Sequence, residues 1–341
     1  MKPFVKWVGG KRQLLPEIEM MMPASFNTYY EPFVGGGALL FDTAPEKAVI
    51  GDMNATLIGT YKSIRDSKAA LIRMLDTLTA SHESAQDKKV FYNQMRERYN
   101  NEVLKNPDSL EICALFIYLN KTCFNGLYRL NSKGKFNVPF NNREKINLYD
   151  DSNLDDIAEY LSHVVIFNGD FEETCKTAKK GDFVFFDSPY APLKPDSFEA
   201  YTKEGFSLKN HERLARLFKE LTGKDVYCML TNHNTELINE LYKEYDGEFT
   251  YAAEINYTER NANEKIVCKN RYSYFIYYRV MINGIEQGCG DLIITTDTKI
   301  EDLKTTEDMC CWLNDIRTPI CKEINAVLNA ANDDKLITND N

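Results

Sequence analysis

The sequence predicts an α/β fold with a mostly parallel sheet and a mainly helical insertion. Short apolar runs typical of buried strands recur along the chain, and helical patterns separate most of them. Strands that alternate with helices favour a parallel sheet covered on both faces. We expect a discontinuous sheet domain (1–57 and 164–280), a mainly helical insertion (58–163), and an acidic C-terminal extension of unknown role (281–341).

Residue periodicity and its interruptions predict the individual elements. Apolar spacing predicts helices over residues 12–22, 209–221 and 235–245, the first ending near Pro23, where a helix loses a backbone donor. Runs rich in β-branched and aromatic residues predict the strands. The predicted strands are 28–33, 48–52, 164–170, 182–187, 226–232, 249–255 and 272–278.

The net charge of −10 is unevenly distributed. From residue 281 onward there are 5 basic and 12 acidic residues, a net charge of −7. Residues 121–145 instead hold 6 basic residues and 1 acidic residue, a net charge of +5. A local basic stretch suits contact with phosphates whatever the total charge, and an ordinary solvated loop is the alternative.

Composition argues against several classes of protein. No run of about 18 uncharged apolar residues occurs, so we expect no membrane span. The N-terminus lacks the features of a signal peptide, which favours a cytoplasmic protein. The nine Cys are scattered without a C-x-x-C motif, and the four His form no H-E-x-x-H motif. We therefore expect reduced thiols in the core and no metal site.

Three glycines lie in the segment EPFVGGGALLF, residues 31–41, between a predicted strand and a helix. Glycines let a ligand approach the backbone, and a helix N-terminus offers free N–H groups. A dinucleotide fingerprint would need Gly in place of Leu40, and a P-loop would need Ser or Thr in place of Arg12. A tight structural turn and a site for S-adenosylmethionine remain. Asp52, at the end of the next strand, would suit the ribose hydroxyls of that cofactor.

The segment FVFFDSPY, residues 183–190, leads from a buried strand into a turn. Asp187 follows the strand, at the edge where open α/β sheets bind ligands. Pro189 favours an extended Ser188, whose carbonyl can then point outward beside the Asp187 carboxylate. Two such acceptors match the two N–H donors of an exocyclic amine, and Tyr190 offers a flat surface to its ring. A turn without further role is the alternative.

This arrangement predicts direct methyl transfer to an amine. Hydrogen bonds to Asp187 and to the Ser188 carbonyl make the nitrogen more nucleophilic and stabilise the charge that develops as it attacks a sulfonium methyl. Alignment with the methyl–sulfur bond supplies much of the remaining rate, without a metal. An adenine amine inside a duplex must first be flipped out of the stack.

Four segments in order resemble a known family: KWVGGKRQLLPEI (6–18), EPFVGGGALLF (31–41), GDF (169–171) and DSPY (187–190). They look like the Dam-type, D12-class DNA adenine-N6 methyltransferases of the alpha arrangement. That resemblance implies a Rossmann-like S-adenosylmethionine-dependent methyltransferase sheet with an inserted target-recognition domain. NKTCFNGLYRLNSKGKFNVPF (120–140) is similar to the family's recognition segment, whose usual target is GATC.

The resemblance also implies roles for single residues. Asp52 would hold the ribose of S-adenosyl-L-methionine, and Asp170 and Phe171 its adenine. The cofactor-binding set is Trp7, Gly10, Lys11, Glu31, Phe33, Gly35, Gly37, Asp52, Asp170 and Phe171, and the catalytic set is Asp187, Ser188, Pro189 and Tyr190.

The same resemblance implies contacts with double-stranded DNA. Arg129 would read a guanine, which Arg does more often than any other residue. Phe124 and Asn125 would enter the base stack, and Leu127 and Pro139 would pack on a base methyl. The DNA-binding set is Phe124, Asn125, Leu127, Arg129, Asn131, Lys133, Pro139 and Arg143.

Two departures from the family pattern matter. Ser188 replaces the first Pro of the usual D-P-P-Y motif; its backbone carbonyl survives, so we expect a modest loss of activity. NNREKINL (141–148) replaces the usual Gly-Arg-Tyr-Lys run, with Arg143 as a substitute phosphate contact, and this leaves the target sequence open.

We expect a monomeric enzyme that methylates adenine N6 in GATC or a near relative, with a cognate restriction endonuclease as a candidate partner. One rival keeps the chemistry but changes the amine to cytosine N4 or a protein glutamine amide. The basic insertion argues against glutamine. A second rival is a DNA-binding protein without catalysis, against which intact Asp187 and Tyr190 argue.

Overall fold

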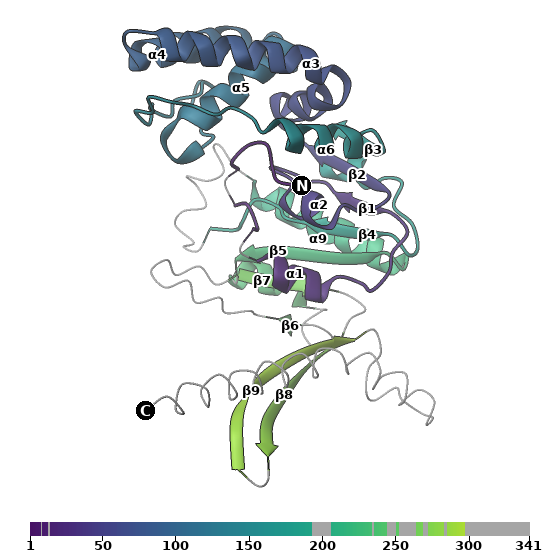
Figure 1. The fold of residues 1–341 in the computed structure, drawn as a ribbon. Coiled ribbons are helices and arrows are strands. Elements are labelled where there is room, and N and C mark those ends of the chain that lie inside the picture. The colour runs from purple at the N-terminus through teal and green to yellow at the C-terminus, as the bar shows by residue number, and fades with distance from the viewer. Residues whose placement is uncertain are drawn as a thin grey trace, which may run out of the picture.

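A sheet with five parallel strands forms the centre of the fold and confirms the predicted α/β class (Figure 1). The computed structural model describes residues 1–7, 9–12, 14–192, 206–233, 235–243, 250–251, 264–268, 272–282 and 285–296. The strand order is β3-β2-β1-β4-β5-β7-β6, in which β7 runs antiparallel to β5 and to β6. The strands are β1 (Tyr29–Glu31), β2 (Ala48–Asp52), β3 (Val164–Asn168), β4 (Phe183–Phe186), β5 (Tyr227–His233), β6 (Thr250–Tyr251) and β7 (Glu264–Cys268).

Strand β4 shows why both faces of the sheet are covered. All four of its residues are buried. Because successive side chains point to opposite faces, Phe183 and Phe185 join one apolar cluster, and Val184 and Phe186 join the other. A strand buried in this way reads as a continuous apolar run, which is how the sequence presents it.

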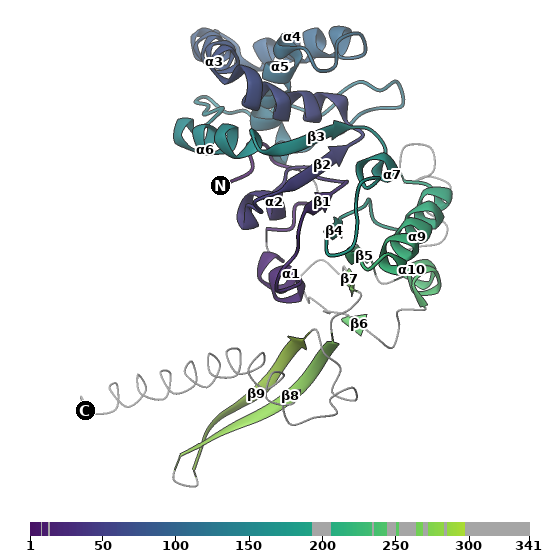
Figure 2. The same cartoon turned by 90° about the vertical axis from the view of Figure 1, so that its right-hand side faces the viewer.

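Helices lie on both sides of the sheet (Figure 2). The long helix α9 places Leu214 and Phe218 in the same cluster as Val184 and Phe186. Helices α1 and α2 lie on the opposite side, where Ile18 and Leu40 join the cluster of Phe183. These helices are α1 (Leu15–Met21), α2 (Ala38–Thr43), α7 (Phe171–Thr174), α9 (Leu208–Gly223) and α10 (Glu236–Leu241).

The insertion is helical, as its sequence predicts, and stands above the sheet in Figure 1. Its helices begin at side chains that accept a backbone N–H, such as Asn54, Asp87 and Ser109, which satisfies a donor that the helix leaves unpaired. Helix α5 lies at its centre, with most of its residues buried. The helices are α3 (Ala55–Ser84), α4 (Lys88–Glu102), α5 (Leu110–Thr122) and α6 (Asp151–Leu161), and η1 (Phe124–Gly126) is a 3-10 turn.

The C-terminal part of the described chain departs from the sequence prediction. The predicted strand 272–278 forms as β8 (Tyr272–Ile282), but β8 pairs with β9 (Ile285–Thr296) in a separate two-stranded sheet. We expected the C-terminal extension to begin at residue 281, and the hairpin crosses that boundary instead. The run LIITT at the end of β9 is rich in β-branched residues, which favour strands. Strand β7 was not predicted, and most of the predicted strand 249–255 lies outside the described residues.

No helix in the described part of the chain is long and apolar enough to cross a membrane.

Asp182, just before β4, accepts hydrogen bonds from two neighbouring backbone segments. Its carboxylate is fully buried and accepts the backbone N–H of Thr28 at 3.1 Å and that of Lys179 at 2.9 Å. The variant Asp182→Ala leaves both donors unpaired, so we expect the free energy of unfolding in urea to fall by about 2–5 kcal/mol. Glu220→Ala is the control, because its ion pair with Lys224 is exposed and contributes little. Equal stabilities of the two variants would contradict the prediction.

Candidate active site

The carboxyl ends of the parallel strands bring the predicted site residues to one edge of the sheet. Strand β1 lies between β2 and β4, so the glycine loop after β1 is flanked by Asp52 at the end of β2 and by Asp187 just after β4. A crevice of this kind, where the strand order reverses, is the usual ligand site of open α/β sheets.

The glycine loop is shaped by close contacts that exclude side chains. Gly35 and Gly37 have φ angles of 49° and 69°. A Cβ on Gly35 would lie 2.6 Å from Cδ1 of Trp7, and a Cβ on Gly37 would lie 2.6 Å from the hydroxyl of Tyr61. That hydroxyl donates to the Gly35 carbonyl at 3.0 Å. Both conformation and space therefore require glycine at these positions.

Asp52 is joined to this loop by hydrogen bonds. Its Oδ2 accepts the N–H of Gly35 at 3.2 Å, and its Oδ1 accepts the N–H of Asn54 at 2.8 Å. Burial raises the pKa of Asp52, and the two backbone donors oppose that rise. The carboxylate is thereby held at the point where β2 ends and the loop passes.

Glu31 lies beneath the loop rather than on its surface. Its side chain is buried, and its Oε2 accepts the hydroxyl of Tyr29 at 2.9 Å. Burial raises the pKa of Glu31 to about 8, and the charge of Asp187 contributes to the rise. The hydroxyl of Tyr29, the backbone of Leu40 and the charge of Lys11 oppose it.

The segment after β4 carries an ion pair between a buried lysine and a half-buried carboxylate. The ammonium of Lys11 lies 2.8 Å from Oδ1 of Asp187 and 4.6 Å from the ring centre of Tyr190. Lys11 is only 6% exposed and also donates to the Gly9 carbonyl at 2.6 Å. The resemblance assigned Lys11 to the cofactor segment. In the structure the Lys11 ammonium forms an ion pair with the Asp187 carboxylate. Gly10 closes the turn before it, donating to the Trp7 carbonyl at 3.2 Å.

The end of β5 contacts the same segment, and sequence reasoning did not identify its residues. Thr231 donates to Oδ1 of Asp187 at 2.7 Å, and Asn232 donates to the Ser188 hydroxyl at 3.3 Å. The ring of His233 meets the ring of Tyr190 edge-on, with centroids 4.8 Å apart. The only signal in the sequence is a polar Thr-Asn-His run at the end of an apolar strand.

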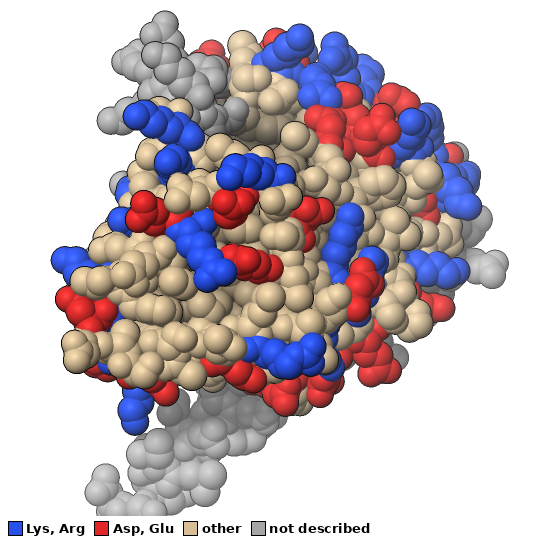
Figure 3. Space-filling model, turned by 90° about the horizontal axis from the view of Figure 1, so that it is seen from above, with Lys and Arg blue, Asp and Glu red and all other residues tan. Residues whose placement is uncertain are grey.

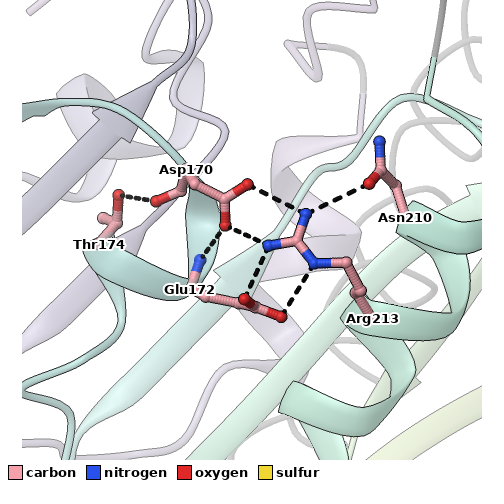
Figure 4. Close-up of polar contacts among 5 residues, drawn as sticks. All are labelled: Asp170, Glu172, Thr174, Asn210 and Arg213. Atoms are coloured by element: carbon pink, nitrogen blue, oxygen red, sulfur yellow. Dashed lines mark hydrogen bonds and ion pairs between the residues drawn. The ribbon is translucent and has the colours of Figure 1, made fainter.

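Asp170 belongs to a cluster of charged residues at the start of α7 (Figure 4). Arg213 from α9 donates to both oxygens of Asp170, at 2.8 and 3.2 Å, and to both oxygens of Glu172, at 2.7 and 3.2 Å. The carboxylates of Glu172 and Asp170 raise the pKa of Arg213. Asn210 also accepts from Arg213, at 3.3 Å. This paired geometry fixes the Asp170 carboxylate.

Three aromatic rings lie beside this cluster. The ring of Phe33, which follows β1, stacks on that of Phe171 at 5.3 Å. Phe206 meets both rings, at 5.6 and 5.9 Å. The guanidinium of Arg213 lies 4.8 Å from the ring centre of Phe171. Two residues predicted to contact a cofactor, Phe33 and Phe171, are thus neighbours although they are far apart in the sequence.

The N-terminal segment connects the glycine loop to the insertion. Trp7, which covers Gly35, stacks on Tyr128 with centroids 5.3 Å apart. The buried amide of Asn120 accepts the N–H of Lys6 at 2.9 Å, and it donates to the carbonyls of Lys6 and Gly126 at 2.8 and 3.0 Å. The loop that the resemblance assigns to DNA recognition is therefore bonded to the segment that leads to Lys11.

That recognition loop is a compact turn with an exposed tip. Phe124 is 52% exposed and lies in η1, and Asn125 has a left-handed φ of 55°. The N–H of Phe124 donates to the Pro139 carbonyl at 2.8 Å, which closes the loop. Leu127 is half-buried against the main core, whereas Pro139 is exposed.

The remaining predicted DNA contacts follow the same loop. Nε of Arg129 donates to the side chain of Asn137 at 2.8 Å, and Asn131 accepts the N–H groups of Lys133 and Lys135 to close a tight turn. The side chains of Arg129, Lys133 and Arg143 are exposed. Seen from above the insertion, basic and acidic side chains are mixed over the face of the molecule (Figure 3).

Within the described residues, no three His, Cys, Asp or Glu side chains gather as a metal ion would require. Cys113, Cys123, Cys175 and Cys228 are buried free thiols.

Comparison with known proteins identifies the class of enzyme. Residues 7–266 match the family described as D12 class N6 adenine-specific DNA methyltransferase. The chain belongs to this family, which is a family of methyltransferases whose substrate is DNA. The Rossmann-like methyltransferase sheet that the sequence predicted is consistent with this membership.

Several curated relatives share most of their length with this chain. The type II methyltransferase M1.LlaDCHI of Lactococcus lactis subsp. cremoris is 40% identical over 269 residues, 78% of this chain and 93% of the relative. The type II methyltransferase M.MjaIII of Methanocaldococcus jannaschii is 38% identical over 259 residues, 72% and 89% of the two chains. The DNA adenine methylase of Escherichia coli (strain K12) is 30% identical over 243 residues, 71% and 84%.

Glu31 makes the stability of the fold depend on pH. Its pKa is about 8 in the fold against 4.5 as its ordinary value, so the folded chain keeps a proton that the unfolded chain has released between these values. The free energy of unfolding should therefore fall as pH rises from 4.5 to 8. Glu31→Gln cannot ionise and keeps an acceptor for Tyr29. We therefore expect this variant to gain stability, relative to the unmodified chain, as pH rises from 4.5 to 8.

Urea denaturation at a series of pH values measures this difference. Glu220→Gln is the control, since this exposed carboxylate should give a profile parallel to that of the unmodified chain. A parallel profile for Glu31→Gln as well would show that Glu31 ionises normally in the fold.

Proposed function

We propose that the protein transfers a methyl group from S-adenosyl-L-methionine to N6 of an adenine flipped out of duplex DNA, within GATC. The observation that carries the proposal is the position of Asp187 at the carboxyl end of β4, with Tyr190 beside it and the glycine loop on the adjacent strand. Membership of an adenine-N6 family supports the choice of adenine over cytosine N4.

The residues around the glycine loop fit the proposed cofactor. Gly35 and Gly37 let the loop adopt left-handed backbone angles while it packs against Trp7 and Tyr61, and the amino-carboxypropyl group would lie against this loop. Asp52, held by Gly35 and Asn54, would accept hydrogen bonds from ribose hydroxyls. The cofactor, when bound, supplies a methyl group activated by its attachment to a sulfonium.

Asp170 and the neighbouring aromatic rings suit the adenine of that cofactor. Phe33 and Phe171 offer flat apolar surfaces, and the fixed carboxylate of Asp170 would accept from an exocyclic amine. Arg213 would keep this carboxylate oriented, since it donates to both of its oxygens. Trp7 and Gly10 would act indirectly, by supporting the glycine loop and the turn before Lys11.

The catalytic segment would act on the target amine by hydrogen bonding. The Asp187 carboxylate and the Ser188 carbonyl would accept its two N–H groups, and Tyr190 would lie against the adenine ring. These acceptors stabilise the positive charge that develops on nitrogen during transfer. The nitrogen–methyl bond would form as the methyl–sulfur bond breaks, which leaves a neutral thioether. The methylated amine would then lose a proton to solvent, so no strong base is required beforehand.

The insertion would bind and read the DNA. The exposed tip formed by Phe124 and Asn125 would fill the space that the flipped adenine leaves. Arg129 would read a guanine through its terminal nitrogens, since Asn137 holds its Nε. Lys133 and Arg143 would contact phosphates. Relatives named DNA adenine methylase and type II methyltransferase support this substrate, and the second name makes a cognate restriction endonuclease a candidate partner.

Methyl transfer to plasmid DNA tests the proposal. Tritium from labelled S-adenosylmethionine should enter DNA with the unmodified chain and not with Asp187→Ala, because this variant lacks the acceptor for the amine. Endonucleases that differ in their tolerance of methylated GATC then read the target. Incorporation without altered cutting at GATC would keep the chemistry and reject the sequence, whereas DNA binding without incorporation would favour a DNA-binding protein without catalysis.

Arg129 and Lys133 should affect DNA recognition differently. Arg129→Ala should cost about 1–3 kcal/mol at one base pair, so that sites altered at that position are methylated nearly as well as the target. Lys133→Ala should weaken binding uniformly and reduce its salt dependence, because a phosphate contact carries no sequence information. Methylation rates on a set of singly altered duplexes distinguish the two, and equal profiles would refute the assignment of Arg129.

A further inference from the structure

We propose that Thr231 and Asn232, at the end of β5, are positioning residues for the catalytic segment 187–191. Thr231 orients the Asp187 carboxylate, and Asn232 holds the segment from Ser188 to Ala191. This inference rests on the proposed function and deepens it, because it assigns roles to two side chains outside the segments by which the family was recognised.

Thr231 is fully buried, and its hydroxyl contacts the carboxylate of Asp187. Oγ1 of Thr231 lies 2.7 Å from Oδ1 of Asp187. An ionised carboxylate can only accept, so the threonine is the donor. Lys11 lies 2.8 Å from the same oxygen. A hydrogen bond and an ion pair on one oxygen fix the rotation of the carboxylate.

The second oxygen of Asp187 is thereby left for another donor. Among the residues that the structure describes, Oδ1 of Asp187 accepts a side-chain hydrogen bond and Oδ2 accepts none. The proposed reaction needs an acceptor for one N–H of the target amine. The hydrogen bond and the ion pair at Oδ1 would therefore decide which oxygen meets the substrate.

The register of the sheet dictates the contact between Thr231 and Asp187. Strands β4 and β5 are parallel, and Phe186 pairs with Leu230. The next residue of each strand is Asp187 and Thr231, so their side chains are neighbours across the two strands. A shift of one residue in this register would turn the threonine to the other face.

Asn232 connects both ends of the catalytic turn. Its amide is fully buried, its Oδ1 accepts the N–H groups of Ala191 and His233 at 2.8 and 2.9 Å, and its Nδ2 donates to the Ser188 hydroxyl at 3.3 Å. His233 adds a bond from Nδ1 to the Ala191 carbonyl at 2.6 Å. Because position 188 is Ser rather than Pro, this network supplies restraint that a Pro ring would otherwise give.

The Thr231 hydroxyl can be removed with little change in side-chain shape. Thr231→Val keeps the branched volume and loses the donor, and Thr231→Ser restores the donor. Thr60→Val is the matched control: Thr60 is also fully buried, and its hydroxyl donates to the Thr56 carbonyl at 2.7 Å within the insertion. Single-turnover methyl transfer at saturating DNA and S-adenosylmethionine measures the chemical step, and separate titrations give the dissociation constants.

We expect Thr231→Val to slow single-turnover transfer about tenfold to a hundredfold, the effect of losing a hydrogen bond to a charged group. The dissociation constants should not change, and Thr231→Ser and Thr60→Val should keep the original rate. The inference fails if Thr231→Val reacts normally, if Thr231→Ser loses as much as Thr231→Val, or if the loss lies in binding.

A double-mutant cycle tests Asn232. Ser188→Ala and Asn232→Ala should each slow transfer. The double variant should slow it less than the product of the two effects, because both substitutions remove the same hydrogen bond between Asn232 and Ser188. Independent effects would refute the contact, and if Asn232→Ala does not fold, the Thr231 variants decide the inference.

An unmodified chain that transfers no methyl would refute the proposed function and this inference with it, whereas an active chain with a normal Thr231→Val would refute this inference alone.

Discussion

The position of β1 between β2 and β4 is the constraint on which the candidate site depends. In a parallel sheet all carboxyl ends meet at one edge, and the chain leaves the central strand with a neighbour on each side. The glycine loop therefore passes between Asp52 and Asp187. The short β1 can serve here because its residues are buried and pair with both neighbouring strands.

Burial of acidic groups at this edge has an energetic cost that a single lysine partly offsets. Glu31 is buried close enough to Asp187 for the two charges to repel, and burial holds the pKa of Glu31 at about 8. The Lys11 ammonium, itself buried, pairs with Asp187. A buried charge is tolerated when it is paired and hydrogen-bonded, and Asp187 has both an ion pair and a threonine donor.

Residues of the N-terminal segment contact both the helical insertion and Asp187. Asn120 and Tyr128 of the insertion hold Lys6 and Trp7, and four residues further on Lys11 reaches Asp187. Trp7 also covers Gly35 in the glycine loop.

Local pattern by itself determined the fold class, the strand ends that carry Asp52 and Asp187, the glycine loop and the family, because each depends on neighbouring residues in one segment. The helical pattern of the residues after β2 also predicted that the insertion is mainly helical. The tertiary structure alone decided which donors meet the acids: Thr231 and Asp187 are 44 residues apart, and Arg213 and Asp170 are 43 apart. Those contacts depend on the register of β5 against β4 and on the packing of α9, which no local spacing encodes. For the same reason β8 was predicted as a strand, but its partner β9 was not.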